Sequence, residues 1–187
     1  MNLEWGSDAS RKFITNVGLV TSDGPNGPNI MACEWTHHVS YEPPLIAVCI
    51  GSGSATAANI RETKEFGVSL CAAGQNVLSS VAGGYSGSEH DKIGALKELG
   101  FKFHKARKIK APMVSGAAMN AECRLVREME IGDHLMLVGE ALFVGAGDEE
   151  PIGYHNGMYW KMSENISKPS DAERKKIKET VEKYRKP

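Results

Sequence analysis

The apolar segments of this chain are short, are rich in Val, Ile, Met and Ala, and end at turn signals. Residues 16–22 (NVGLVTS) read as a strand, 23–28 (DGPNGP) as a turn, and 29–40 (NIMACEWTHHVS) as the returning strand of a hairpin. The run LIAVCIG at 45–51 follows the chain-breaking YEPP and has the length of a central strand. A chain punctuated in this way favours a fold built mainly from β-strands.

The rest of the chain continues this pattern with few helices. Residues 66–73 (FGVSLCAA) are another strand candidate, and the loop-rich stretch 83–100 contains one short predicted helix. Two long apolar segments, 113–130 and 133–147, are separated by the dipeptide at 131–132 and predict a second hairpin. Several short strands with two or three helices predict a closed β structure.

The tail from residue 170 onward has the pattern of an amphipathic helix. Ser170 and Glu173 form a capping box. An apolar stripe follows at helical spacing: Ile177, Val181 and Tyr184. We therefore predict a domain over 1–168 and, over 169–187, a C-terminal helical extension that packs on it, with a basic face that is solvated and is not a nucleic-acid patch.

Length and charge limit the classes of function. A chain of 187 residues makes one ordinary domain with room for a small appendage. Charged residues make up 24% and the formal net charge is -1, so nothing favours nucleic acid as a partner. The opening MNLEWGSDASRKF lacks the apolar core of a signal peptide, and no apolar run reaches membrane-spanning length.

The cysteines and histidines give no metal-binding pattern. The four cysteines lie far apart within apolar stretches: Cys33, Cys49, Cys71 and Cys123. We interpret them as reduced, mostly buried thiols, which predicts a cytoplasmic location. A metal enzyme is a competing hypothesis, but His37 and His38 are adjacent in a predicted strand and point to opposite faces. No metal site is predicted.

The stretch IGSGSATAANI begins like a nucleotide-binding loop. A Rossmann fingerprint needs three glycines, a βαβ unit and an acidic residue about 20 positions further on. Here Gly51 and Gly53 are followed by Thr56 in place of the third glycine, and the positions about 20 beyond the loop read CAAGQN. The dinucleotide fingerprint is therefore excluded.

What remains is a strand that leads through Ser52, Ser54 and Thr56 into a helix predicted to start near Ala57. A helix start presents unpaired N–H groups and a partial positive charge, and nearby hydroxyls donate further bonds to an anion. With Thr56 as the cap, the third helical position is the uncharged Asn59, which does not repel phosphate. A phosphate site and an ordinary helix cap are both open readings of these residues.

Two further stretches carry candidate ligand contacts. In the predicted strand 29–40, alternation groups Met31, Cys33 and Trp35 against Ala32, Glu34 and Thr36. Such a strand, with an aromatic residue near its end, can line a flat ring, although Trp35 alone also suits a core. In 131–140 (IGDHLMLVGE) a tight turn places His134 at the mouth of the last long strand, where it either meets a ligand or is a solvent-facing turn residue.

The order of these pieces resembles a known family. VTSDGPNGPNIMACEWTHHVSYEPPLIAVCIGSGSATAANIRETKEF, SGSEHDK, AECRL and GDHLMLVGEA occur in the order and spacing of the flavin reductase-like FMN-binding split-barrel family. This family includes flavoredoxins, archaeal FMN-binding proteins, ferric reductases and reductase components of two-component monooxygenases. The resemblance covers Ser10 to Gly157. It implies a mainly β, Greek-key split β-barrel and a homodimer that holds FMN without a covalent bond near the dimer interface.

Family positions carry over to individual residues. The resemblance implies that the isoalloxazine lies along Asn29, Met31, Ala32, Cys33, Glu34, Trp35 and Thr36. It implies that the phosphate is held by Ser52, Ser54, Thr56 and Asn59 with help from Lys92, and that His134 lies where a nicotinamide is received. Glu34 departs from the small or hydroxylic residue expected there, and the phosphate segment is unusually rich in glycine and serine.

The implied activity needs no acid or base residue. Hydride transfer from NADH or NADPH to FMN is the chemistry of the cofactors, so the protein stacks and orients the rings. Electrons then pass to free flavin, ferric iron or a partner protein. Two alternatives stay open: a flavoredoxin-type carrier reduced by a protein donor, and a flavin-binding module without turnover.

Overall fold

The computed structural model describes residues 3–4 and 6–186. The first strands of the chain are β1 (Ile14–Asn16), β2 (Gly18–Gly24), β3 (Gly27–Cys33), β4 (Thr36–Ser40), β5 (Leu45–Gly51) and β6 (Glu65–Leu70). The later strands are β7 (Phe103–Lys105), β8 (Pro112–Val114), β9 (Met119–Ile131), β10 (His134–Ala146), β11 (Ile152–His155) and β12 (Met158–Lys161). The helices are η1 (Ser10–Lys12), α1 (Ala55–Thr63), α2 (Asn76–Gly84), α3 (Lys92–Glu98) and α4 (Asp171–Glu182).

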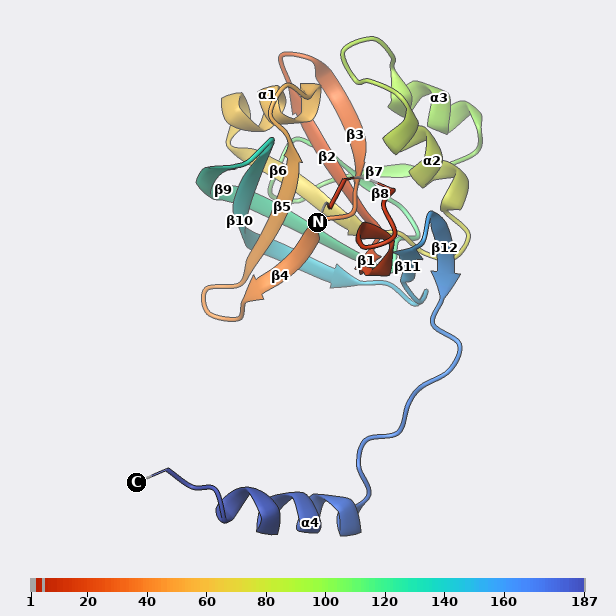
Figure 1. The fold of residues 1–187 in the computed structure, drawn as a ribbon. Coiled ribbons are helices and arrows are strands. Elements are labelled where there is room, and N and C mark those ends of the chain that lie inside the picture. Colours follow the sequence, from red (N-terminus) through yellow and green to blue (C-terminus); the bar gives the residue numbers. More distant parts are fainter. Residues whose placement is uncertain (1–2, 5, 187) are drawn as a thin grey trace.

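The central feature is a seven-stranded antiparallel sheet in the order β3-β2-β6-β9-β10-β5-β4. The sheet curves, so that β4 and β5 lie in front of β9 and β10 (Figure 1). Its two end strands, β3 and β4, follow one another directly in the chain but are not neighbours in the sheet. The predicted mainly β fold is confirmed, with the sheet open between its two ends.

Alternation along the strands divides the core between the two faces of the sheet. The inner face carries one buried cluster that includes Val20, Val48, Phe66, Leu135 and Leu137. The outer face packs with α2 and α3 through a second cluster that includes Leu19, Ile30, Leu78, Leu96 and Val114. Successive residues of β2 and β3 therefore contribute to opposite clusters, as the period of two requires.

The predicted strand 16–22 is divided in the structure. β1 ends at Asn16 and pairs with β11 in a separate three-stranded sheet, whereas β2 begins at Gly18. A Cβ on Gly18 would collide with the Thr36 hydroxyl, so this position needs the close approach that only glycine allows. The division follows from a tertiary contact that the local pattern does not contain.

The predicted second hairpin is confirmed as β9 and β10, whose register pairs Ile131 with His134. Gly132 has a φ of 60°, the left-handed conformation that its tight turn requires. The loop-rich stretch 83–100 contains the one expected short helix as α3, whereas α2, which ends at Gly84, was not predicted. The short pairs β7–β8 and β11–β12 were not predicted.

The predicted C-terminal helix is present as α4, and Ser170 and Glu173 form its capping box. Its expected packing on the domain is not seen in the single chain: Ile177, Val181 and Tyr184 are all more than half exposed, and α4 lies away from the sheet (Figure 1). The segment 162–170 is exposed throughout and leads the chain away from β12 (Figure 1). Among the described residues no helix is both long and apolar enough to cross a bilayer.

Candidate functional site

The segment between β5 and α1 forms an exposed helix start. α1 begins at Ala55, and the hydroxyl of its N-cap Ser54 accepts a hydrogen bond from the N–H of Ala57 at 3.1 Å. The sequence predicted Thr56 as the cap and a helix start near Ala57, and both positions were wrong by two residues. Ser54 is the cap, and Thr56 is the second residue of the helix, where it is buried. The Ser54 hydroxyl can still donate its hydrogen to an anion, and Ser52 beside it is exposed. Unpaired N–H groups at the start of a helix carry a partial positive charge, which also favours an anion at this place.

The other two predicted phosphate residues point into the protein. Thr56 is 1% exposed and accepts a hydrogen bond from the Asn29 amide at 3.0 Å. Asn59 is fully buried, and its oxygen accepts from the N–H of Asn26 at 2.9 Å. The Asn59 amide nitrogen donates to the Ser22 hydroxyl and to the Gly27 carbonyl. Both side chains therefore tie α1 to the β2–β3 hairpin, and both are buried in that role.

The predicted strand 29–40 breaks between β3 and β4. Glu34 and Trp35 lie in the break and are exposed, whereas Thr36 is 2% exposed. The Thr36 hydroxyl donates to the Cys33 carbonyl at 3.0 Å, and the Thr36 carbonyl accepts from the Asn16 amide. The expected alternation fails at this point, and Thr36 faces Gly18 in place of a ligand ring.

Hydrogen bonds join the break to β5. The N–H of Cys49 donates to the Trp35 carbonyl at 2.9 Å, and the Cys33 thiol donates to the Cys49 carbonyl at 3.3 Å. Burial raises the pKa of the Cys33 thiol, so it stays protonated and acts as a structural donor. These contacts set the position of Trp35 at the opening between the two ends of the sheet.

Trp35 and His134 meet although they are 99 positions apart in the chain. Their ring centroids are 4.6 Å apart with a tilted angle of 52°. The Asp133 carboxylate lies 2.7 Å from Nδ1 of His134, and this hydrogen bond lowers the pKa of Asp133. His134 also pairs with Gly51 in the β10–β5 register, one residue before Ser52. The structure thus brings the predicted nicotinamide residue beside both the ring segment and the phosphate segment.

A cavity of about 400 Å³ opens beside the break. Its lining contains three predicted ring residues, Ala32, Cys33 and Glu34. The remaining walls come from β1–β2, α2 and the β11–β12 pair: Val17, Ser79, Ser80, Gly83, Tyr154 and Tyr159. Burial raises the pKa of Glu34, and burial together with the charge of Glu34 raises the pKa of Tyr154. The cavity combines aromatic faces, hydroxyl groups and one carboxylate.

β3 supplies the backbone beside this cavity. Among the described residues β3 is an end strand, so backbone groups on its outer edge are not paired with a strand of that sheet. Met31 is partly buried, and Asn29 is 3% exposed because its amide is bonded to Thr56. Of the predicted ring residues, Ala32, Glu34 and Trp35 are accessible, whereas Asn29, Cys33 and Thr36 are buried in support of the strand.

Lys92 does not reach the phosphate segment. Its ammonium group donates to the carbonyl oxygens of Ala82 and Tyr85, each at 3.1 Å, and so satisfies the C-terminal end of α2. Burial lowers the pKa of Lys92 to about 8. The loop before it comes closer, since a Cβ on Gly87 would collide with the Asn29 amide. The sequence-based assignment of Lys92 to a phosphate is therefore replaced by a structural role.

Sequence reasoning missed the residues that α2 and β11–β12 bring to the site. The Tyr159 hydroxyl donates to the Ser79 hydroxyl at 3.1 Å, which closes one wall of the cavity. Tyr154 and Tyr159 were not predicted as site residues, because β11 and β12, the strands that contain them, were not predicted. Within residues 3–4 and 6–186, no three His, Cys, Asp or Glu side chains are grouped as a metal site.

Comparison with known proteins places this geometry in a family. Residues 10–163 match the model of the flavin reductase like domain. A protein of Archaeoglobus fulgidus is 35% identical over 127 residues, which cover 67% of this chain and 69% of that protein. The FMN reductase (NADH) SmoA of Agrobacterium fabrum is 27% identical over 152 residues, 81% of each chain.

The fold has solved counterparts. The NADH:FAD oxidoreductase SgcE6 of Streptomyces globisporus superposes with a TM-score of 0.75 at 24% identity. The match covers 83% of this chain and 90% of that one. At this identity the likeness establishes the arrangement of the strands and helices.

Proposed function

Because the chain belongs to the flavin reductase like domain family, we propose that it is an FMN-binding oxidoreductase that uses NADH or NADPH. The observation that carries the proposal is the grouping of three features at the opening between β3 and β4. These features are the α1 start at Ser52 and Ser54, the Trp35–His134 pair, and the cavity beside Glu34. They suit a ligand with a phosphate at one end and a flat ring at the other.

The residues present fit a flavin. The Ser54 hydroxyl and the N–H groups of the α1 start would hold the phosphate, with Ser52 next to them. The free edge of β3 and the accessible side chains of Ala32 and Trp35 would position the ring. When bound, the flavin supplies the hydride and electron chemistry, and the protein supplies binding and orientation.

His134 would orient the nicotinamide end of the donor. The Asp133 carboxylate next to Nδ1 holds the imidazole in one orientation, and the Trp35 ring packs against it. Position is what hydride transfer requires, since reacting atoms must be held in contact and in line. This role explains why His134 is fixed by two neighbours although it lies at a strand end.

We further propose a homodimer and a cytoplasmic location. Large apolar side chains at the site are exposed in the single chain, with Trp35 at 48% and Ile131 at 47%, which supports a covering partner. The four cysteines are free thiols, which suits a reducing compartment. Free flavin, ferric iron or a protein are the candidate acceptors.

The test is the visible spectrum of the purified protein, recorded with added FMN before and after anaerobic addition of NADH or NADPH. Flavin bands that co-purify or appear on titration and then bleach rapidly are the expected result. Bands that persist until a protein donor is added would favour the flavoredoxin-type carrier. A protein that takes up no FMN would refute the flavin assignment.

A further inference from the structure

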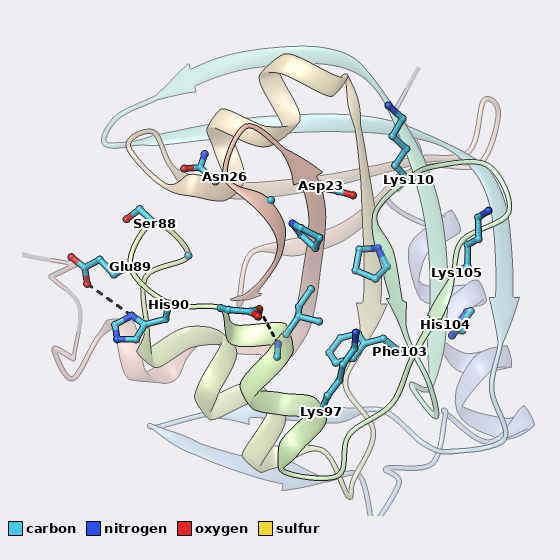
Figure 2. A pocket seen from close by; sticks show the side chains of 17 residues that line it. Asp23, Asn26, Ser88, Glu89, His90, Lys97, Phe103, His104, Lys105 and Lys110 are labelled. Atoms are coloured by element: carbon cyan, nitrogen blue, oxygen red, sulfur yellow. Dashed lines mark hydrogen bonds and ion pairs between the residues drawn. The ribbon is translucent and has the colours of Figure 1, made fainter.

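Cavities lie at both ends of β3, and their charges differ. The larger cavity, of about 770 Å³, opens at the beginning of the strand (Figure 2). Its lining contains three lysines and three carboxylates: Lys97, Lys105, Lys110, Asp23, Glu89 and Asp91. Charges of both signs surround this space, so these side chains do not select a ligand by the sign of its charge.

The cavity beside Glu34, at the end of β3, carries charge of one sign. Among the described residues that line it, Glu34 alone has a formally charged side chain. Within residues 3–4 and 6–186 the Glu34 carboxylate has no hydrogen bond and no ion pair. A carboxylate in the wall of a cavity, without a counter-charge, makes the potential there negative. The cavity therefore favours a positively charged ligand.

The titration of the lining agrees with this sign. Burial raises the pKa of Glu34, because the ionised carboxylate is partly removed from water. The charge of Glu34, together with burial, raises the pKa of Tyr154 across the cavity. A cation between these groups would lower both pKa values, since it stabilises the carboxylate and the phenolate.

Two aromatic side chains give the cavity a second feature that suits a cation. Tyr154 and Tyr159 both line it, with ring centroids 5.5 Å apart and an angle of 60° between the rings. The Tyr159 hydroxyl donates to Ser79, a buried residue of α2, which holds the ring in place. Aromatic rings attract ammonium groups and also pack against the alkyl groups around them.

The lining favours an organic cation over a metal ion. A metal ion in a protein takes several oxygen, nitrogen or sulfur ligands, and this cavity has one carboxylate. A volume of about 400 Å³ lies near the lower end of the range for small-molecule sites. Val17 and Ala32 add apolar surface for the uncharged part of such a ligand.

We propose that this cavity binds a small organic cation, with its ammonium group beside Glu34 and the rings of Tyr154 and Tyr159. The flavin contacts proposed above are Ser52, Ser54, Ala32 and Trp35, and of these only Ala32 lines the cavity. The carboxylate, the two tyrosines and the α2 wall are left for a second molecule. The cation site therefore goes beyond the proposed function and is tested separately from it.

The first experiment titrates the full-length protein with choline and with 3,3-dimethylbutan-1-ol by calorimetry. The two probes have the same shape, but only choline carries a positive charge. Choline should bind at least about tenfold more tightly, because the neutral probe gains nothing from the carboxylate and little from the aromatic rings. Equal affinities, or no choline binding up to about 100 mM, would overturn the proposal.

A second experiment compares substitutions of two glutamates. Glu34→Gln should weaken choline binding by at least about fivefold, because it removes the only charge of the lining. Glu42→Gln is the matched control, since Glu42 is exposed and does not line the cavity, and its choline affinity should stay within about twofold of the unchanged protein. Equal losses in the two variants would indicate a nonspecific charge effect and contradict the proposal. Thermal unfolding verifies that both variants fold.

The aromatic contribution is tested at Tyr159. Tyr159→Leu should weaken choline binding by about threefold, since it removes one ring. Tyr159→Phe keeps the ring and loses the hydroxyl that bonds to Ser79, so its choline affinity should exceed that of Tyr159→Leu. Equal affinities in these two variants would exclude a contact between the ring and the cation.

A final titration repeats the choline measurement with saturating FMN and with NAD⁺. Choline should bind together with FMN, because only Ala32 is shared between the two sites. Displacement of choline by FMN or by NAD⁺ would assign the cavity to that ligand and overturn the proposal. A protein that takes up no FMN but still distinguishes choline from the neutral probe would lose only the proposed function.

Discussion

The two ends of β3 face cavities of different chemistry. At the beginning of the strand the cavity is lined by three lysines and three acidic residues, and at its end the cavity contains Glu34 with tyrosine and serine hydroxyls. Asn29 and Ile30 between them are buried, and Asn29 is bonded to α1. The two ends of one strand therefore differ: charged side chains of both signs surround its beginning, and aromatic rings and hydroxyl groups with one carboxylate surround its end.

The comparison depends on β3 keeping its place between α1 and α2, and Asn59 is the strongest test of that. Asn59→Ala should lower the free energy of unfolding by about 3 kcal/mol, since it removes the hydrogen bonds to the buried Ser22 hydroxyl, the Gly27 carbonyl and the Asn26 N–H. Urea unfolding measures the loss. Asn76→Ala, at an exposed position of α2, is the control and should change stability by less than about 0.5 kcal/mol. A loss in Asn59→Ala no larger than in this control would show that the hairpin does not depend on Asn59.

Lys92 follows the loop 87–91, which lines the cavity at the beginning of β3. The pH dependence of stability tests whether Lys92 is buried at the end of α2. The folded pKa is about 8 and the ordinary value is 10.5, so between these values the folded protein has released a proton that the unfolded chain keeps. Stability should therefore rise as pH increases from about 8 to about 10.5, by on the order of 2 kcal/mol. Lys92→Met should remove this rise, as measured by urea unfolding at several pH values. A rise of equal size in Lys92→Met would assign it to other groups.

The phosphate end of the flavin site can be weakened separately. Ser52→Ala with Ser54→Ala should raise the Kd for FMN by about tenfold, because two hydroxyl donors to an anion are lost. Riboflavin has no phosphate, so its Kd should stay the same. Fluorescence quenching of each flavin on binding measures both constants. A parallel loss for FMN and riboflavin would place the effect on the ring or on folding.

Substitution of Glu34 should have the smallest effect on stability, and it tests the charge of the cavity at the end of β3. Burial raises its folded pKa above the ordinary value of 4.5, so its ionised form costs stability. This cost is absent below the unfolded pKa, grows as pH rises through the folded pKa, and is complete above it. Glu34→Gln should therefore be more stable than the unchanged protein at pH 8 and equally stable in acid, as measured by denaturant midpoints.

Sequence patterns correctly predicted the strands, turns and helices that neighbouring residues determine. The apolar run of β5, the β9–β10 hairpin around Gly132, and the capping box of α4 are all specified by neighbouring residues. The strand pattern also favoured a mainly β fold, and the family resemblance assigned ligand roles to Trp35 and His134, which the structure brings into contact. The predictions of β5, the β9–β10 hairpin and α4 held because spacing and turn chemistry determine these elements directly.

The errors arose where a distant contact decided the outcome. Thr36 left the expected face because it packs on Gly18 and bonds to the Cys33 carbonyl. Asn59 and Lys92 were assigned to a phosphate, but the structure directs one to the β2–β3 turn and the other to the end of α2. Polar residues of this kind suit a ligand or a buried backbone group equally well in the sequence, and only the packing distinguishes them.

The exposed segment 162–170 acts as a tether for α4. Nine residues span at most roughly 30 Å when extended and about 17 Å on average when flexible. A short flexible tether corresponds to a local concentration in the millimolar range. A molecule bound to the apolar stripe of α4 is therefore kept near the seven-stranded sheet, so even a weakly bound partner would meet the domain repeatedly before diffusing away.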